Sequence, residues 1–124
     1  MAKILVADDE VDLEMLIKQK FRQKIREKEY EFVFAINGND ALDKIRQNPD
    51  VDIVLSDINM PGMSGLELLG HIKQKYLKPP PVVMMITAYG DAENFNMAKQ
   101  LGADDFLTKP VDFNLLKEKL KSIH

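Results

Sequence analysis

Short apolar runs alternate with amphipathic stretches five times along this chain of 124 residues. The apolar runs lie at 3–7, 31–36, 51–56, 82–86 and 106–107. A short run that is apolar at nearly every position is typical of a strand that is buried on both faces of a sheet. We therefore expect five buried strands, each followed by a helix.

The stretches between the runs repeat their apolar residues at helical spacing. The first stretch carries one apolar stripe, made of Leu13, Leu16, Ile17, Phe21 and Ile25. Its basic residues lie mainly off this stripe, and they are Lys18, Arg22, Lys24 and Arg26. We expect one long helix whose basic face is solvated.

Polar residues at the right spacing predict where the later helices begin and end. Asn39 is expected to cap a short helix, and Ser64 is expected to cap the next one. Gly102 follows a helix over 91–100 and suits the left-handed position after its end. Asp112 is expected to cap the last helix. The inward residues of these helices are expected to be Leu42, Ile45, Leu66, Leu69, Ile72, Leu115, Leu116 and Leu120.

Strands that alternate with helices predict a parallel sheet with right-handed crossovers. Five such units predict an α/β fold, a flavodoxin-like (βα)5 three-layer sandwich around a five-stranded parallel sheet of strand order 2-1-3-4-5. The length suits one domain, 1–124. The three prolines at 79–81 are interpreted as an extended connector into the fourth strand and not as a domain boundary.

The amino-acid composition excludes several classes of function. The chain has no Cys, which excludes disulfides, thiolate metal sites and cysteine nucleophiles, and its two His are His71 and His124. The net charge of −3 and the pI of about 5.4 predict no direct nucleic acid binding. Because no apolar run suits a signal peptide or a membrane span, we expect a cytoplasmic protein.

Four strand ends carry side chains with complementary chemistry. Asp8 and Asp9 follow the first strand, Asp57 ends the third, Thr87 ends the fourth, and Lys109 comes just after the fifth. In an open parallel sheet, ligands bind beyond the carboxyl ends of the strands. Since the first and third strands are neighbours in the expected order, the three carboxylates should share one crevice.

Three carboxylates in one crevice repel each other, so either some stay protonated or a cation neutralises them. Hard oxygen ligands select Mg²⁺, Mn²⁺ or Ca²⁺. A carboxylate nucleophile, a metal, the ammonium of Lys109 and the hydroxyl of Thr87 are the parts that phosphoryl transfer needs. Singly, Asp8 suits a helix cap and Lys109 a surface position, so the hypothesis rests on their joint occurrence. Asp52 stands near the start of the third strand, at the wrong end of the sheet.

At this point the sequence resembles a known family, the CheY-like receiver domains of two-component response regulators. The resemblance covers essentially the whole chain. It rests on the acidic pair Asp8-Asp9, the sequence DINMPGMSG at 57–65, the pair Thr87-Ala88 and the sequence GADDFLTKP at 102–110. Each motif alone is weak, and all four in order at the family's spacing are a specific signal.

The resemblance implies a phosphorylation site and a metal site. Asp57 would be the phospho-acceptor. Mg²⁺ would be ligated directly by Asp9 and Asp57, by Asp8 largely through bound water, and by the main-chain carbonyl of Asn59.

The resemblance also implies roles for residues around the acceptor. Lys109 would pair with the acceptor or the phosphoryl group, and Thr87 would hydrogen-bond a phosphoryl oxygen. Phe106 takes the place of the family's aromatic switch residue. The Lys109–Pro110 peptide bond is a candidate for the cis form.

By this resemblance the chain would take a phosphoryl group from a sensor histidine kinase or a histidine phosphotransfer protein. It would promote phosphorylation and dephosphorylation of its own Asp57 without being a stand-alone enzyme. Phosphorylation would alter the surface over 91–122, which would contact a downstream effector, a fused output domain or a second copy in a homodimer.

Two alternatives remain open at this stage. The first is a small metal-dependent aspartyl-phosphate phosphatase of the haloacid dehalogenase class, which Asp8 and Glu10 faintly resemble, although that class uses a longer chain with a cap. The second is a flavodoxin-like cofactor binder, which would need a phosphate-binding loop where this chain has acidic residues.

Overall fold

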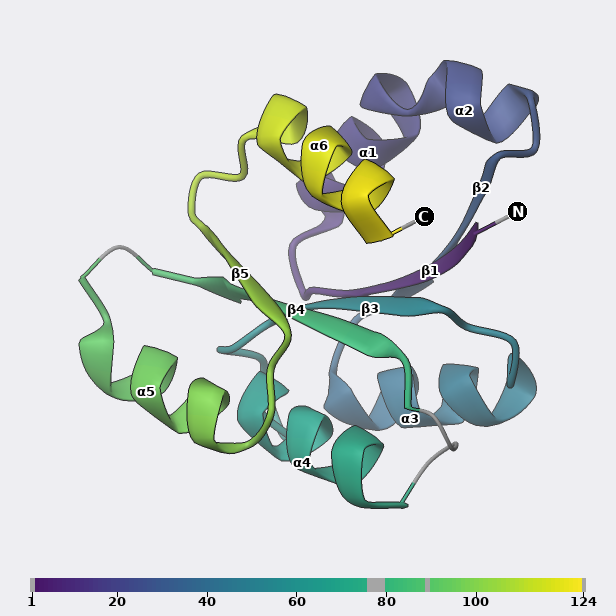
Figure 1. The fold of residues 1–124 in the computed structure, drawn as a ribbon. Coiled ribbons are helices and arrows are strands. Elements are labelled where there is room, and N and C mark those ends of the chain that lie inside the picture. The colour runs from purple at the N-terminus through teal and green to yellow at the C-terminus, as the bar shows by residue number, and fades with distance from the viewer. Residues whose placement is uncertain (1, 76–79, 89, 124) are drawn as a thin grey trace.

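The computed structural model describes residues 2–75, 80–88 and 90–123. Within these residues, five strands form one parallel sheet (Figure 1). The strands are β1 (Ala2–Ala7), β2 (Tyr30–Ala35), β3 (Ile53–Asp57), β4 (Val82–Thr87) and β5 (Asp105–Thr108). Their order is β2-β1-β3-β4-β5, which confirms the predicted order.

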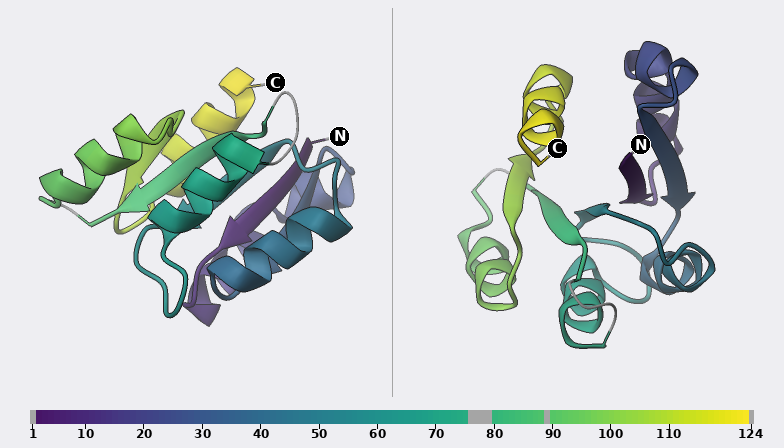
Figure 2. Two further views of the ribbon diagram at one scale, coloured as in Figure 1. Left: turned by 90° about the horizontal axis from the view of Figure 1, so that it is seen from below. Right: turned by 45° about the vertical axis from the view of Figure 1, so that its right-hand side comes forward.

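Six helices of the described chain cover the two faces of the sheet. They are α1 (Val11–Lys20), α2 (Arg22–Arg26), α3 (Gly38–Gln47), α4 (Gly65–Lys75), α5 (Ala92–Gln100) and α6 (Phe113–Ile123). Helices α1, α2 and α6 lie on one face, and α3, α4 and α5 lie on the other (Figures 1 and 2). The α/β three-layer sandwich is therefore confirmed.

Each face of the sheet has its own hydrophobic core. In β1, Leu5 and Ala7 belong to the core under α3 and α4, whereas Ile4 and Val6 belong to the core under α1 and α6. Successive side chains of a strand point to opposite faces. Because both faces are covered, most strand positions are apolar and the strands do not alternate regularly between apolar and polar residues.

The expected first helix is divided in two at Phe21, whose backbone leaves the helical region with φ −105° and ψ 15°. Leu13, Ile17 and Phe21 form a buried row at four-residue spacing. Leu16 and Ile25 lie beside this row and remain 39% and 36% exposed, so the prediction of one five-residue stripe was wrong for them. The inward face is narrower than the sequence pattern indicated.

The helix starts were predicted well except for one. Asn37, and not Asn39, caps α3: its extended backbone places the side chain to accept a hydrogen bond from the Asp40 N–H at 2.8 Å. Ser64 accepts from the Glu67 N–H, and Asp112 accepts from the Leu115 N–H, as predicted.

Three predictions on the later helices concern single residues. Gly102 has the predicted left-handed backbone, with φ +97°. Leu115 is 42% exposed, because the inward row of α6 runs through Leu116 and Leu120. Leu66 is only half-buried, and Leu68 takes the central inward position of α4. No helix within the described residues is both long and apolar enough to cross a membrane.

Candidate functional site

The carboxyl ends of the strands bring the predicted polar residues to one edge of the sheet. Asp8 follows β1, Asp57 is the last residue of β3, and Thr87 is the last residue of β4. Carboxylate oxygens of Asp8, Asp9 and Asp57 all lie within 4.8 Å of one another. The strand order places β3 in the centre of the sheet, so Asp57 is only 2% exposed.

Asp57 is held by two donors. The Lys109 ammonium donates to its Oδ2 at 2.7 Å, and the Asn59 N–H donates to its Oδ1 at 3.2 Å. The Lys109 N–H in turn donates to the Thr87 carbonyl at 2.9 Å, which fixes the start of the β5–α6 loop against β4. The end of the sheet thus positions the ammonium group that faces Asp57.

Burial and the neighbouring carboxylates shift two pKa values in the crevice. Burial is the largest influence on Lys109 and lowers its pKa, but the hydrogen bond to Asp57 and the surrounding negative charges raise the pKa overall. The pKa of Asp8 is raised from 3.8 to about 6, chiefly by burial; the hydrogen bond from the Glu10 N–H opposes this rise, and the charge of Asp57 adds to it. Asp8 therefore loses its proton less readily than an exposed aspartate, chiefly because the crevice shields its carboxyl group from solvent.

This donor set fits a hard divalent cation. Every side chain that converges with Asp57 from β1 offers carboxylate oxygen, and Asp9 is exposed to solvent while Asp57 is buried. Mg²⁺ typically binds through one or two carboxylates and keeps several waters. An exposed ligand beside a buried one leaves room for such waters.

Thr87 and Phe106 lie on the side of the crevice toward α5. The Thr87 hydroxyl is 4% exposed and makes only a long hydrogen bond of 3.5 Å to the Leu107 carbonyl. The Phe106 ring is half-buried against the Phe95 ring of α5, with 4.3 Å between the ring centres. The weak hydroxyl contact leaves Thr87 free to take a better acceptor.

Gly65 is a site residue that the sequence argument did not identify. Its N–H donates to the Ile58 carbonyl at 2.7 Å, and a methyl group added to it would overlap the carbonyl oxygen of Asp57. The only signal in the sequence was its place at the end of the motif at 57–65. Gly65 lets the loop after β3 close tightly against Asp57.

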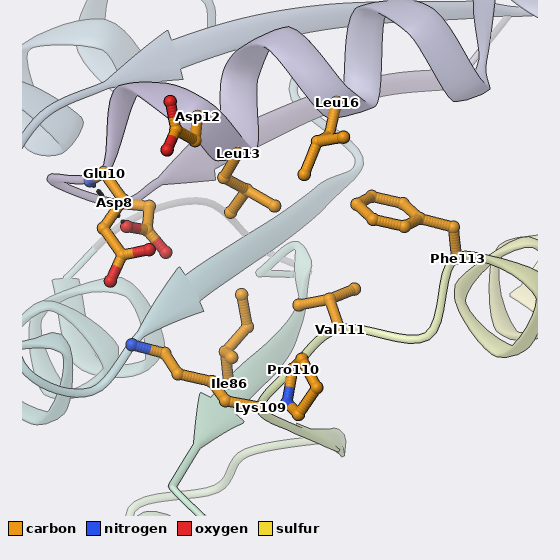
Figure 3. Close-up of a pocket in the computed structure, with 10 residues that line it drawn as sticks. All are labelled: Asp8, Glu10, Asp12, Leu13, Leu16, Ile86, Lys109, Pro110, Val111 and Phe113. Atoms are coloured by element: carbon orange, nitrogen blue, oxygen red, sulfur yellow. Dashed lines mark hydrogen bonds between the residues drawn. The ribbon is translucent and has the colours of Figure 1, made fainter.

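An apolar groove of about 430 Å³ opens directly beside Lys109 (Figure 3). Its floor and walls come from Leu13 and Leu16 of α1, from Val111 of the loop that joins β5 to α6, and from Phe113 at the start of α6. Acidic residues of the β1–α1 turn border the groove on one side (Figure 3). This groove also explains why Leu16 is not part of the core.

The remaining residues singled out from the sequence lie at several places in the fold. The Lys109–Pro110 peptide bond is cis, as expected. Asp52 lies at the opposite end of the sheet, where it accepts a hydrogen bond from the Lys3 N–H at 2.9 Å. Met84 and Met85 belong to the apolar run at 82–86 and are fully buried core residues. The first proline of the connector at 79–81 lies outside the described residues.

Comparison with known proteins gives a consistent result. The sequence model of the family described as response regulator receiver domain matches residues 4–121. The response regulator protein PilR of Pseudomonas aeruginosa is 38% identical over 117 residues, which are 94% of this chain and 24% of PilR. A cyclic di-GMP phosphodiesterase of Thermotoga maritima is 35% identical over 97% of this chain and 30% of its own length. The chain thus spans less than a third of these two curated relatives.

Solved structures show the same similarity. A response regulator receiver domain protein from Clostridium thermocellum superposes with a TM-score of 0.85 at 31% identity, covering 99% of this chain and 94% of that one. The chemotaxis protein CheY4 of Vibrio cholerae superposes with a TM-score of 0.82 at 27% identity, covering 100% of this chain and 99% of that one.

Proposed function

Because the chain belongs to the response regulator receiver domain family, we propose that it acts as a switch by accepting a phosphoryl group on Asp57. The observation that carries this assignment is the environment of Asp57. Its carboxylate ends the central strand, receives the Lys109 ammonium at 2.7 Å and shares its crevice with two further carboxylates. We assign the whole chain, 1–124, to this one unit in the cytoplasm.

The proposed reaction needs few groups from the protein. An oxygen of the Asp57 carboxylate attacks the phosphorus of a phosphohistidine in a sensor histidine kinase or a histidine phosphotransfer protein. A P–O bond forms, the P–N bond breaks, and the imidazole leaves with its electron pair and takes up a proton. Lys109 stabilises the negative charge on the phosphoryl oxygens, and positioning supplies most of the remaining acceleration.

Asp8, Asp9, Asp57 and the main-chain carbonyl of Asn59 are the groups that would hold Mg²⁺. The bound cation would neutralise charge on the carboxylates and on the incoming phosphoryl group. The raised pKa of Asp8 fits this assignment, because burial disfavours the charged form of its carboxyl group and a bound cation would stabilise that form.

The groove beside Lys109 is where we expect the phosphodonor to dock. It brings apolar side chains of α1 and of the start of α6, including Leu16 and Phe113, next to the cation that faces Asp57. On the other flank of α1, Val11 and Met15 are 68% and 64% exposed. A helical donor could cover both flanks while its histidine reaches the crevice.

We expect phosphorylation to change the surface that α5, β5 and α6 form. If Thr87 turns its hydroxyl toward a phosphoryl oxygen, it vacates space beside β5, and Phe106 can rotate into that space. This would bias a two-state element already present in the unphosphorylated ensemble. The surface over 91–122 would then present a different face to an effector, a fused output domain or a second copy.

The alternatives of a small aspartyl-phosphate phosphatase and of a flavodoxin-like cofactor binder are not favoured. The receiver family covers residues 4–121, and acidic residues follow β1 where a cofactor phosphate would have to bind.

Acetyl phosphate with Mg²⁺ tests the proposal without knowledge of the natural donor. We expect the intact mass to rise by one phosphoryl group in the wild-type protein and in Asp52→Asn, and to stay unchanged in Asp57→Asn, because an amide is a poor nucleophile. A chelator should abolish the uptake. Undiminished uptake by Asp57→Asn would refute the assignment.

A further inference from the structure

The chain is acidic overall, but one segment of it is strongly basic. Residues 18–28 contain six Lys or Arg residues and one Glu, although the whole protein has a net charge of −3. Lys18 pairs with Glu14, and Lys24 pairs with Glu29. The remaining basic residues are exposed and have no ion pair within the described chain, and they are Lys20, Arg22, Arg26 and Lys28.

This segment borders the open edge of the sheet. β2 is the outermost strand of the sheet. The Glu29 carbonyl, just before β2, accepts from the Ala2 N–H, and the Ala35 carbonyl accepts from the Asp8 N–H just after β1. In a parallel pair, alternate residues of a strand direct both backbone groups to the same neighbour. The backbone groups of Tyr30, Phe32 and Phe34 therefore point away from β1, toward the open edge.

A hollow of about 440 Å³ lies between this edge and the helices. Lys18, Arg22 and Ile25 line it from α1 and α2. Tyr30, Glu31, Phe32 and Phe34 line it from β2, and the Glu31 carboxylate is paired with the Lys3 ammonium at 3.1 Å. Ile25 is 36% exposed, and both phenylalanines are half-buried. Apolar walls, a basic rim and unpaired strand backbone thus meet at one place.

We propose that this surface, formed by α2 and the free edge of β2, binds an extended acidic segment of a partner protein that adds as a strand beside β2. Main-chain hydrogen bonds would form with Phe32 and its outward-facing neighbours, as in other cases of strand addition. Apolar side chains of the segment would enter the hollow beside Ile25. Its carboxylates would meet Arg22 and Arg26, and this charge complementarity determines which partner fits.

The same residues favour a peptide over other anionic partners. The Phe34 ring is covered by the Lys18 ammonium at 5.4 Å and lies parallel to Phe32, with 6.2 Å between ring centres. Phe32 is also in contact with Phe21, with ring centres 5.3 Å apart. These contacts occupy ring faces on which nucleobases would stack. The rings also line a hollow and do not project, as insertion into a lipid surface would require.

The surface is separate from the phosphorylation crevice. The crevice lies at the carboxyl end of the central strand, whereas the basic segment leads into the amino end of the edge strand. A bound segment would leave Asp57 accessible. The proposal therefore goes beyond the proposed phosphoryl transfer and does not depend on it.

The probe for the test is a short fluorescein-labelled peptide in which glutamates alternate with leucine and phenylalanine, titrated with the 124-residue chain and followed by anisotropy. We expect saturable binding that weakens with salt. Arg22→Glu should weaken it by about tenfold or more, an effect of about 1.4 kcal/mol. Lys99→Glu, on the opposite face of the sheet, is the charge-matched control and should bind normally.

Phe32→Pro tests the strand pairing, because it removes an N–H that points to the open edge and leaves the ladder to β1 intact. We expect it to abolish binding. Amide exchange in the wild-type protein gives an independent measure: the Phe32 N–H should become protected when the peptide binds. Unchanged affinity in Arg22→Glu, an unprotected Phe32 amide, or tighter binding of single-stranded DNA or phosphatidylglycerol vesicles would overturn the proposal.

Discussion

Replacing Asp8 by Asn should stabilise the metal-free protein at neutral pH. The pKa of Asp8 is raised from 3.8 to about 6, chiefly by burial and also by the charge of Asp57. An Asn side chain keeps the oxygen that accepts from the Glu10 N–H at 2.8 Å. The substitution therefore removes an unfavourable charge and retains the local hydrogen bond.

The direction of the pH dependence follows from how many protons the folded and unfolded states bind. When the pH rises from about 4 to about 6, the unfolded state loses the Asp8 proton first, so the folded state holds more protons and loses stability. A rise in pKa from 3.8 to about 6 corresponds to about 3 kcal/mol in full. Because Asp8 is only half-buried and solvent screens part of this energy, we expect about 1 to 2 kcal/mol at pH 7.

Urea denaturation in the presence of a chelator measures this effect. At pH 7 the unfolding midpoint of Asp8→Asn should exceed that of the wild-type protein, and near pH 4 the difference should vanish. Asp43→Asn removes an exposed carboxylate on α3 and should change stability by less than about 0.5 kcal/mol. If Asp8→Asn is no more stable than the wild-type protein at pH 7, the claim that burial of the charged Asp8 carboxylate destabilises the metal-free protein is wrong.

Three further substitutions test individual contacts. Gly65→Ala should lower the free energy of unfolding in urea by about 1 to 3 kcal/mol, because its methyl group would overlap the Asp57 carbonyl. Gly70→Ala is the control: its methyl group meets no atom of the described residues within 4 Å, so the free energy of unfolding should not fall. Lys109→Ala should slow acetyl phosphate uptake by about 100-fold in a mass time course, with Mg²⁺ binding by NMR retained. Thr87→Val should keep phosphoryl uptake but lose the beryllofluoride-induced NMR shifts of Phe106, and normal shifts in that variant would contradict the switch.

The sequence predicted the sheet and the acidic crevice because both depend on strong, local patterns. Buried parallel strands are apolar at every position, and the polar groups follow directly at their carboxyl ends. Once the strand order is assigned, Asp8 and Asp57 must meet. The pairing of Lys109 with Asp57 was implied by the family resemblance, and the structure places the two groups 2.7 Å apart.

The predictions from the sequence failed where tertiary packing, and not a local pattern, determines the position of a residue. Leu16 fits the apolar stripe of its helix, but it packs toward Phe113 across a groove that no local pattern indicates. Asn37 and Asn39 are both good capping residues, and only the backbone at the end of β2 selects Asn37. The requirement for a glycine at 65 depends on a contact with the Asp57 carbonyl, which becomes visible only when the loop is folded.

The position of the phosphoryl group tests the central claim most directly. The protein would be treated with acetyl phosphate and Mg²⁺, reduced with borohydride to mark the acyl phosphate, digested and mapped by tandem mass spectrometry. We predict that the mark falls on Asp57, at the end of the strand Ile53–Asp57, and on no other carboxylate. A mark on Asp8, Asp9 or Asp52, with Asp57 unmodified, would contradict the account.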